Sequence, residues 1–153
     1  MPRGKPTHAQ AELMLKVYDL RREGRMRTAR DWFFNNFAPK TMQEMQHLMP
    51  PGSDESAYVR MVTSYWEMVC ALLNHGLLHE ELFFETTGEQ YLVWVRVQPV
   101  LADFRKQFSK YSFAHTEKAA QRYEKWWERR EPGRIQRLRE FFATPPMQQQ
   151  RPG

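Results

Sequence analysis

The sequence predicts an all-α domain of six or seven helices with a bend near Pro99, and three features support this fold class. Apolar residues recur at steps of three and four along several segments, which is the spacing of one helix face. Threonine and serine stand where helix N-caps are expected. Ten Phe, six Tyr and five Trp in 153 residues supply enough apolar bulk for one core. We expect one domain over residues 1–143 and a disordered tail over residues 144–153.

The N-terminal part of the chain is predicted to hold three helices. Thr7 begins a Thr-x-x-Gln capping box ahead of a helix from His8 to Glu23. A second helix, from Met26 to Phe37, has a strongly aromatic end. Thr41 begins another capping box, which indicates a short third helix before a Pro-Pro-Gly loop.

The strongest helix prediction covers Asp54 to His75. Ser53 is the expected N-cap, acidic residues follow in the first turn, and Gly76 is expected to end the helix. One side carries an apolar stripe at steps of three and four, formed by Val59, Val62, Trp66, Val69 and Leu73.

Residues 82–97 allow two interpretations. The segment from Thr86 to Glu89 would suit the turn of a hairpin between two stretches rich in β-forming residues. A helix is preferred, because one helical stripe continues through the segment. That stripe consists of Trp94, Val97, Leu101, Phe104 and Phe108. Pro99 then either bends this helix or lies at the first position of a helix that starts near Gln98.

Two further helices are expected near the C-terminal end, from Glu117 to Arg130 and from Arg134 to Phe142. The first has an aromatic side within a charged sequence. The predicted architecture also requires Trp66 and Trp94 to face inward from two packed helices.

A short pattern in the centre of the chain resembles a known family. The central helix is followed by a Gly-Leu-acidic connector and then by a Trp-x4-Pro-x5-Arg helix, formed here by Trp94, Pro99 and Arg105. From Tyr58 to Phe108 this pattern is similar to an uncharacterised family of small bacterial all-helical proteins, a domain of unknown function. The resemblance implies a helical fold for residues 82–108 and implies no activity.

Composition excludes several classes of protein. The single cysteine, Cys70, cannot form an intramolecular disulfide, and the N-terminal residues lack the apolar core of a secretory signal. The longest apolar run stops at Arg96, far short of the roughly 20 residues that span a bilayer. We therefore expect a cytoplasmic protein without a membrane span.

The net charge of +5 is unevenly distributed along the chain. Lys and Arg outnumber Asp and Glu by nine to four in residues 1–40 and by thirteen to six in residues 96–153, whereas residues 41–95 hold eight acids and one base. Either the terminal helices pair with the acidic middle, which we prefer, or they expose a basic face to an anionic partner.

Nucleic-acid binding is the alternative function that the basic segments suggest. Arginine and lysine would neutralise phosphates, and Trp126 and Trp127 would be available to stack on nucleobases. Against this, nearby glutamates can pair with the same cations along a helix. The candidate contacts are Arg25, Arg27, Arg30, Arg122, Lys125, Arg129, Arg130, Arg134 and Arg137.

No metal, cofactor or catalytic group is predicted from the other polar residues. His75 and His79 are spaced like metal ligands, but Gly76 interrupts the helix between them, so we interpret them as connector or capping residues. Cys70 is expected to be a buried structural thiol. No acid–base pair is predicted among the acids that were considered, Glu67, Glu81 and Glu85.

Arg96 and Arg105 are the candidates for ligand binding. Arg96 interrupts an apolar run, so it either pairs with Asp103, which we prefer, or contacts an anion in a cleft. If the bend at Pro99 opens a pocket, Arg96 and Arg105 would hold a carboxylate or phosphate there.

The function that the sequence favours is non-catalytic, namely a protein-interaction or assembly module with a protein partner or a second copy of the chain. Abundant aromatic residues motivate this hypothesis, as do the methionines, which often line adaptable binding surfaces. The methionines concerned are Met42, Met45, Met49 and Met61. Nucleic-acid binding is the first alternative, and a small anionic ligand near Arg96 is the second.

Overall fold

The computed structural model describes residues 4–146, which form nine α-helices and one 3-10 helix and contain no strand. The all-α prediction is confirmed, and the helices outnumber the six or seven expected. Residues 147–153 of the predicted tail lie outside the described part. In chain order the helices are α1 (His8–Arg21), α2 (Gly24–Asn36), α3 (Met42–Leu48), α4 (Asp54–Asn74), α5 (Glu80–Thr86), α6 (Glu89–Val97), η1 (Gln98–Val100), α7 (Leu101–Gln107), α8 (Ala114–Arg130) and α9 (Arg134–Ala143).

Local sequence sets several helix ends as predicted. The capping box of α1 is complete, because Thr7 Oγ1 accepts from the Gln10 amide at 3.1 Å and Gln10 Oε1 accepts from the Thr7 amide at 2.9 Å. Ser53 caps α4 by accepting from the Ser56 amide at 3.1 Å. Beyond α4 the chain turns at Gly76, whose φ of +78° favours glycine.

The preferred helical interpretation of residues 82–97 is confirmed, although the segment forms two helices. Thr87 and Gly88, in the stretch that would suit a hairpin turn, instead separate α5 from α6. Pro99 lies in the 3-10 helix that separates α6 from α7. A break is expected there, because proline has no amide proton to donate to the preceding turn.

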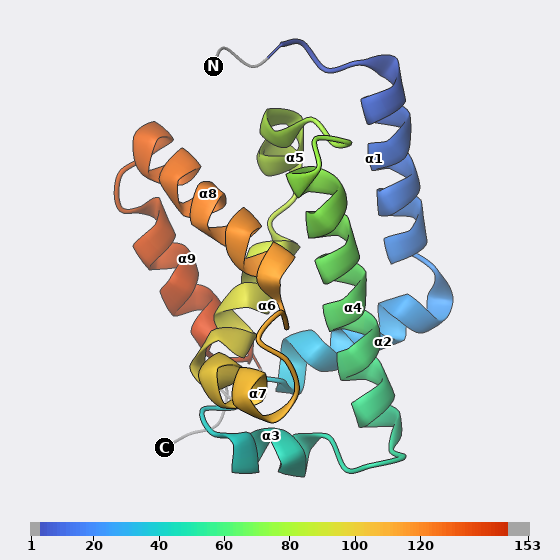
Figure 1. Cartoon of the computed structure of the whole chain (residues 1–153), viewed down its shortest axis with the longest axis vertical. Helices are drawn as coiled ribbons and strands as arrows, with labels where there is room; N and C mark the ends of the chain where they lie inside the picture. The colour runs from blue at the N-terminus through green and yellow to red at the C-terminus, as the bar shows by residue number, and fades with distance from the viewer. Residues whose placement is uncertain (1–3, 147–153) are drawn as a thin grey trace.

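The core is built around α4, which runs through the centre of Figure 1. Its most extensive contacts are with α2 and α8, and α6 in turn packs on α8 and α9. Trp66 and Trp94 are both buried, so the predicted inward orientation of the two indoles is confirmed. Within residues 4–146, no helix has the length and apolar character needed to cross a membrane.

Ion pairs join the terminal helices to the acidic middle of the chain, which confirms the preferred interpretation of the charge distribution. Four arginines from α1, α2 and α8 contact glutamates of residues 80–89 at 2.5 to 3.8 Å. The pairs are Arg21 and Arg30 with Glu89, Arg122 with Glu80, and Arg130 with both Glu81 and Glu85.

Candidate functional site

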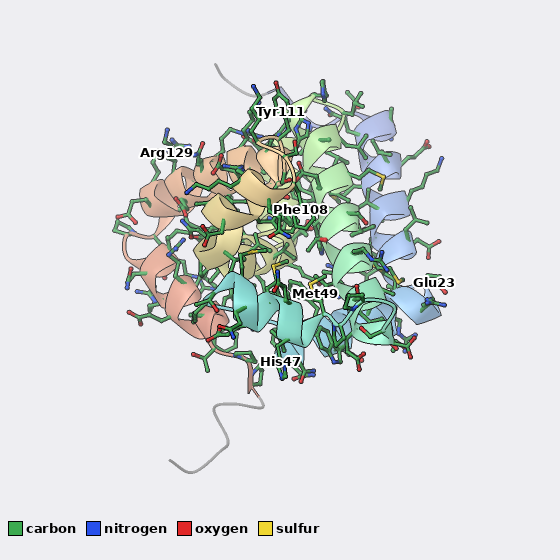
Figure 2. The ribbon with its side chains drawn as sticks, turned by 60° about the horizontal axis from the view of Figure 1, so that its bottom comes forward. Glu23, His47, Met49, Phe108, Tyr111 and Arg129 are labelled. Atoms are coloured by element: carbon green, nitrogen blue, oxygen red, sulfur yellow. The ribbon has the colours of Figure 1, made fainter. Side chains whose placement is uncertain are left out.

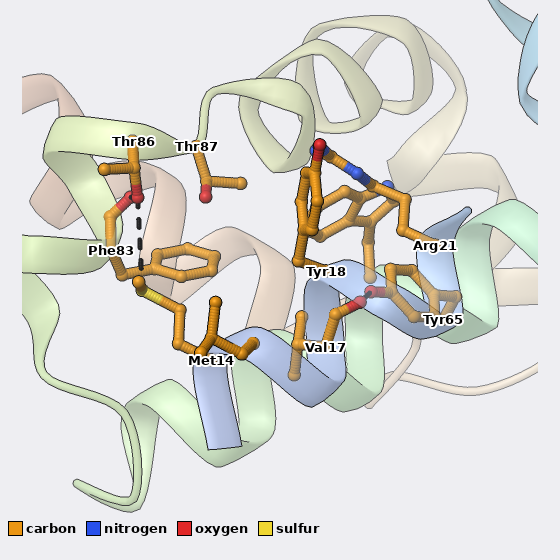
Figure 3. A pocket seen from close by; sticks show the side chains of 10 residues that line it. Met14, Val17, Tyr18, Arg21, Tyr65, Phe83, Thr86 and Thr87 are labelled. Atoms are coloured by element: carbon orange, nitrogen blue, oxygen red, sulfur yellow. Dashed lines mark hydrogen bonds between the residues drawn. The ribbon is translucent and has the colours of Figure 1, made fainter. Parts of the chain in front are cut away.

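A cavity of about 260 Å³ lies where α1 meets α4 and α5 (Figure 3). Its apolar lining includes Met14 and Val17 of α1, Trp66 of α4 and Phe83 of α5. Thr87, in the connector to α6, also lines it. The cavity therefore exists because three helices and one connector meet without filling the space between them.

Helix α1 leaves apolar surface at the rim of this cavity. Val17 is its one buried residue, whereas Leu15 and Tyr18 line the cavity while 64% and 47% exposed. The hydroxyl of Tyr65 donates to the carbonyl of Val17 and ties α1 to α4. Burial raises the pKa of Tyr65 to about 12, so this hydroxyl remains a donor at neutral pH.

Arg21, the last residue of α1, forms the polar end of the cavity. Its Cζ lies 5.0 Å from the centre of the Tyr18 ring, and its Nη1 is 3.8 Å from Glu89 Oε2. The side chain is 20% exposed, and its Nε is buried without a hydrogen-bond partner in residues 4–146. A buried donor without an acceptor is unfavourable. An acceptor that reached this nitrogen would relieve this cost.

Glu89, the first residue of α6, holds the arginines at this end of the site. Arg30 binds it through two bonds, from Nε to Oε1 at 2.8 Å and from Nη2 to Oε2 at 2.7 Å. Trp66 Nε1 donates to the same Oε1 at 3.3 Å. The hydrogen bonds with Glu89 raise the pKa of Arg30. Because Arg30 has the short contacts, Arg21 has only the longer one, and two guanidinium groups share one carboxylate.

Arg96 is buried at the ends of two helices and does not pair with Asp103. Its Nη1 donates to the carbonyls of Phe34 at 3.1 Å and Phe37 at 2.8 Å, and its Nε donates to the carbonyl of Phe142. A cation is favourable at these C-terminal ends of α2 and α9. Burial lowers the pKa of Arg96 to about 10, which leaves it charged at neutral pH. The predicted pair is wrong, because η1 interrupts the helical register and Asp103 lies exposed on α7.

Arg105 has a separate set of partners. Its Nε donates to the carbonyl of Ser112 at 3.0 Å, and its Nη2 lies 3.3 Å from Glu117 Oε1. These contacts link α7 to the beginning of α8. They favour a structural role for Arg105, as the carbonyl contacts do for Arg96, and ligand binding by this pair stays a prediction.

The residues of the nucleic-acid alternative fall into two groups. Five are ion-paired with glutamates, namely Arg30, Arg122, Arg130, Arg134 and Arg137. Four form no ion pair within residues 4–146, namely Arg25, Arg27, Lys125 and Arg129. Figure 2 shows Arg129 and Glu23, the N-cap of the helix that carries Arg25, at opposite edges of the molecule. Two of the unpaired cations therefore lie on α2 and two on α8, and nucleic-acid binding stays a prediction.

The histidines of the connector lie at helix ends, as their interpretation as capping residues predicts. His75 is the C-cap of α4, and His79 Nδ1 accepts from the Leu82 amide at 3.2 Å at the start of α5. Among residues 4–146, no group of three His, Cys, Asp or Glu residues is placed to hold a metal ion. Glu81 and Glu85 both contact Arg130 at the surface.

Glu67 and Cys70 belong to the buried seam between α4 and α8. The Glu67 carboxylate accepts from the amides of His115 at 2.7 Å and Thr116 at 2.9 Å, and from Thr116 Oγ1 at 2.6 Å. It therefore acts as the N-terminal cap of α8 from another helix. Cys70 is fully buried, as predicted, and burial together with Glu67 raises the pKa of its thiol to about 12.

Sequence reasoning did not identify the cavity. Met45 is buried, and the other methionines expected at a binding surface, Met42, Met49 and Met61, pack partly buried against the core. The methionine that lines the cavity is Met14. One signal was present, because α1 has apolar residues on more than one side, including Leu13, Leu15, Val17 and Tyr18. Such a helix leaves apolar surface exposed when only one side is covered.

A comparison with protein families identifies this chain. A family model described as a domain of unknown function, DUF4760, matches residues 6–126. The chain belongs to this family. The match spans every residue that lines the cavity and includes the Trp94, Pro99 and Arg105 pattern, so the resemblance to an uncharacterised family is confirmed over a longer stretch. Comparison with curated proteins and with solved structures gives no match.

Proposed function

We propose that this protein is a non-catalytic interaction module whose cavity beside α1 receives an apolar side chain of a partner protein. The observation that carries the proposal is an apolar cavity with exposed Leu15 and Tyr18 at its rim. Exposed apolar residues beside a concave site are typical of surfaces that bind other proteins. Anchoring side chains that fill such pockets supply much of the binding energy.

The size of the cavity favours a single side chain over a larger ligand. Its volume of about 260 Å³ is below the roughly 300–1,000 Å³ of sites for drug-sized molecules. Its lining is mostly aromatic and aliphatic, with Phe83 and Trp66 from two different helices. A large apolar side chain, such as that of tryptophan or leucine, matches both the size and the lining.

A neutral mimic of such an anchor provides the direct test. Titration with N-acetyl-tryptophanamide, followed by amide nitrogen–proton NMR, should move the resonances of Met14, Thr86 and Thr87, which surround the cavity. Resonances of α3, which lies at the opposite end of the molecule from α5 in Figure 1, should stay in place. Shifts that spread evenly over the molecule, or that are absent at the cavity, would reject the proposal.

Two substitutions on α1 distinguish probe binding at the cavity from probe binding elsewhere on the surface of this helix. Leu15→Glu adds a carboxylate at the rim, and it should weaken probe binding about tenfold or more, because the charge would lose water when the probe enters. Leu20→Glu is the matched control, because Leu20 is 57% exposed on the same helix and does not line the cavity. Equal effects of the two substitutions would contradict a site at the cavity.

The partner can also be a second copy of the chain. In that case sedimentation velocity should show a dimer that forms with rising protein concentration, and Leu15→Glu should remain monomeric. If the wild-type protein stays monomeric at every concentration, the partner is not a second copy of the chain.

A further inference from the structure

The polar end of the cavity holds one hydrogen-bond donor that has no acceptor. Arg21 Nε is buried without a partner in residues 4–146. Glu89 does not supply one, because its two oxygens accept from Arg30 at 2.8 and 2.7 Å and its nearest contact with Arg21 is Nη1 at 3.8 Å. An arginine held beside an apolar space with an unused donor is suited to binding an anion.

The surroundings of Arg21 carry an excess of positive charge. Arg22 also lies against the Tyr18 ring, with its Cζ 5.4 Å from the ring centre. Arg21 and Arg30 share the single carboxylate of Glu89. Glu85, the acid next to the cavity-lining Thr86 on α5, is paired with Arg130 at 3.7 Å. The rim at Tyr18 therefore attracts negative charge.

We propose that the partner of this cavity is an acidic segment, in which a carboxylate next to the apolar anchor binds Arg21. This inference rests on the proposed function, since the anchor must occupy the cavity for the carboxylate to reach Arg21. The apolar side chain enters the cavity beside Met14. The partly exposed Arg21 side chain then turns so that its Nε, which is buried in the free protein, donates to the carboxylate. The anchor then provides most of the affinity, and the charge provides the selection.

Two pentapeptides with blocked termini test whether acidic residues beside the anchor increase the affinity. In one, a central tryptophan has glutamates on both sides, and in the other the glutamates are replaced by glutamines. Both should shift the resonances of Met14 and Thr87, and the acidic peptide should bind about fivefold to tenfold more tightly at low salt, as expected for a partly exposed charged hydrogen bond. The difference should shrink at about 1 M salt, where the screening length is about 3 Å.

Arg21→Met removes the donor and keeps an unbranched apolar stem. It should abolish the preference for the acidic peptide, so that the two peptides bind Arg21→Met with the same affinity. Arg22→Met is the matched control. It also removes one positive charge beside the Tyr18 ring, but Arg22 does not line the cavity. It should keep most of the preference.

The outcomes separate this inference from the function on which it rests. If both peptides bind equally at the cavity, the anchor site stands and selection by charge is wrong. If the preference survives in Arg21→Met, or is lost equally in Arg22→Met, Arg21 is not the selecting residue. If neither peptide shifts the cavity resonances, the proposed function itself fails.

Discussion

Helices α1 and α4 lie side by side (Figure 1) but bury very different parts of themselves. Helix α1 buries one of its fourteen residues, and α4 buries seven of its twenty-one. Both helices begin at a residue whose side chain caps the N-terminus, so N-capping does not explain the difference in burial. Helix α4 has its apolar stripe between α2 and α8, whereas α1 has apolar residues facing several directions. The first arrangement stabilises the fold, and the second leaves the apolar surface on which we propose that a partner binds.

Two arginines show the same contrast. Arg96 is 2% exposed, and its donors bind carbonyls at the ends of α2 and α9. Arg21 is 20% exposed at the end of α1, with one buried donor unused. Substitutions in the two regions should therefore differ in whether they change stability or binding.

Arg96→Met should have the largest effect on stability. It leaves helix-end carbonyls of α2 and α9 without their donor in the interior, and we expect a loss of about 3 kcal/mol or more in the free energy of unfolding, measured with urea. Arg105→Met is the control, because its partly exposed pair with Glu117 should cost about 1 kcal/mol or less. Similar losses for the two variants would show that the carbonyl contacts of Arg96 contribute little.

Glu67→Gln should come second. The neutral amide keeps the shape of the side chain but removes the charge that caps α8, where the carboxylate accepts three hydrogen bonds. We expect a loss of about 2 kcal/mol in urea unfolding. Glu81→Gln, which affects a surface contact of 3.8 Å with Arg130, should have an effect of about 0.5 kcal/mol or less. If Glu67→Gln is as stable as the wild type, the charge of this cap contributes little to the contact between α4 and α8.

Alkaline pH should weaken the seam through Cys70. Burial first, and Glu67 second, raise the pKa of its thiol from 9.0 to about 12. A group with a raised folded pKa contributes its full stability below the unfolded value, so the loss begins near pH 9 and continues toward pH 12. At pH 10 it amounts to about 1 kcal/mol. Under reducing conditions, Cys70→Ala should lose less stability than the wild type between pH 8 and pH 10, and equal losses would contradict this origin.

The sequence was sufficient to predict what depends on neighbouring residues. The capping box at Thr7, the end of α4 at Gly76 and the break at Pro99 each depend on residues a few positions apart. The inward orientation of Trp66 and Trp94 follows from helical spacing alone. The expected fold class, and most helix ends to within two or three residues, could be obtained in this way.

The cavity and the partners of Arg96 depend on how distant segments meet. Phe34 and Phe142 are far from Arg96 in the chain, and their carbonyls become its acceptors only when α2 and α9 pack beside α6. Arg21 stood among several basic residues near the end of α1, and nothing in its local sequence distinguished it from Arg22. Its unused donor arises because Glu89, in a different helix, is already bound by Arg30.

Arg21→Met should have the smallest effect on stability of the changes considered. Its contact with Glu89 is 3.8 Å long, and its substitution removes a buried donor without a partner. We expect a change of about 0.5 kcal/mol or less in the free energy of unfolding, while the preference for the acidic peptide disappears. Urea unfolding of this variant beside Arg96→Met measures the contrast directly. A loss above about 1 kcal/mol would place Arg21 with the structural arginines, and α1 would then belong to the stabilising part of the fold.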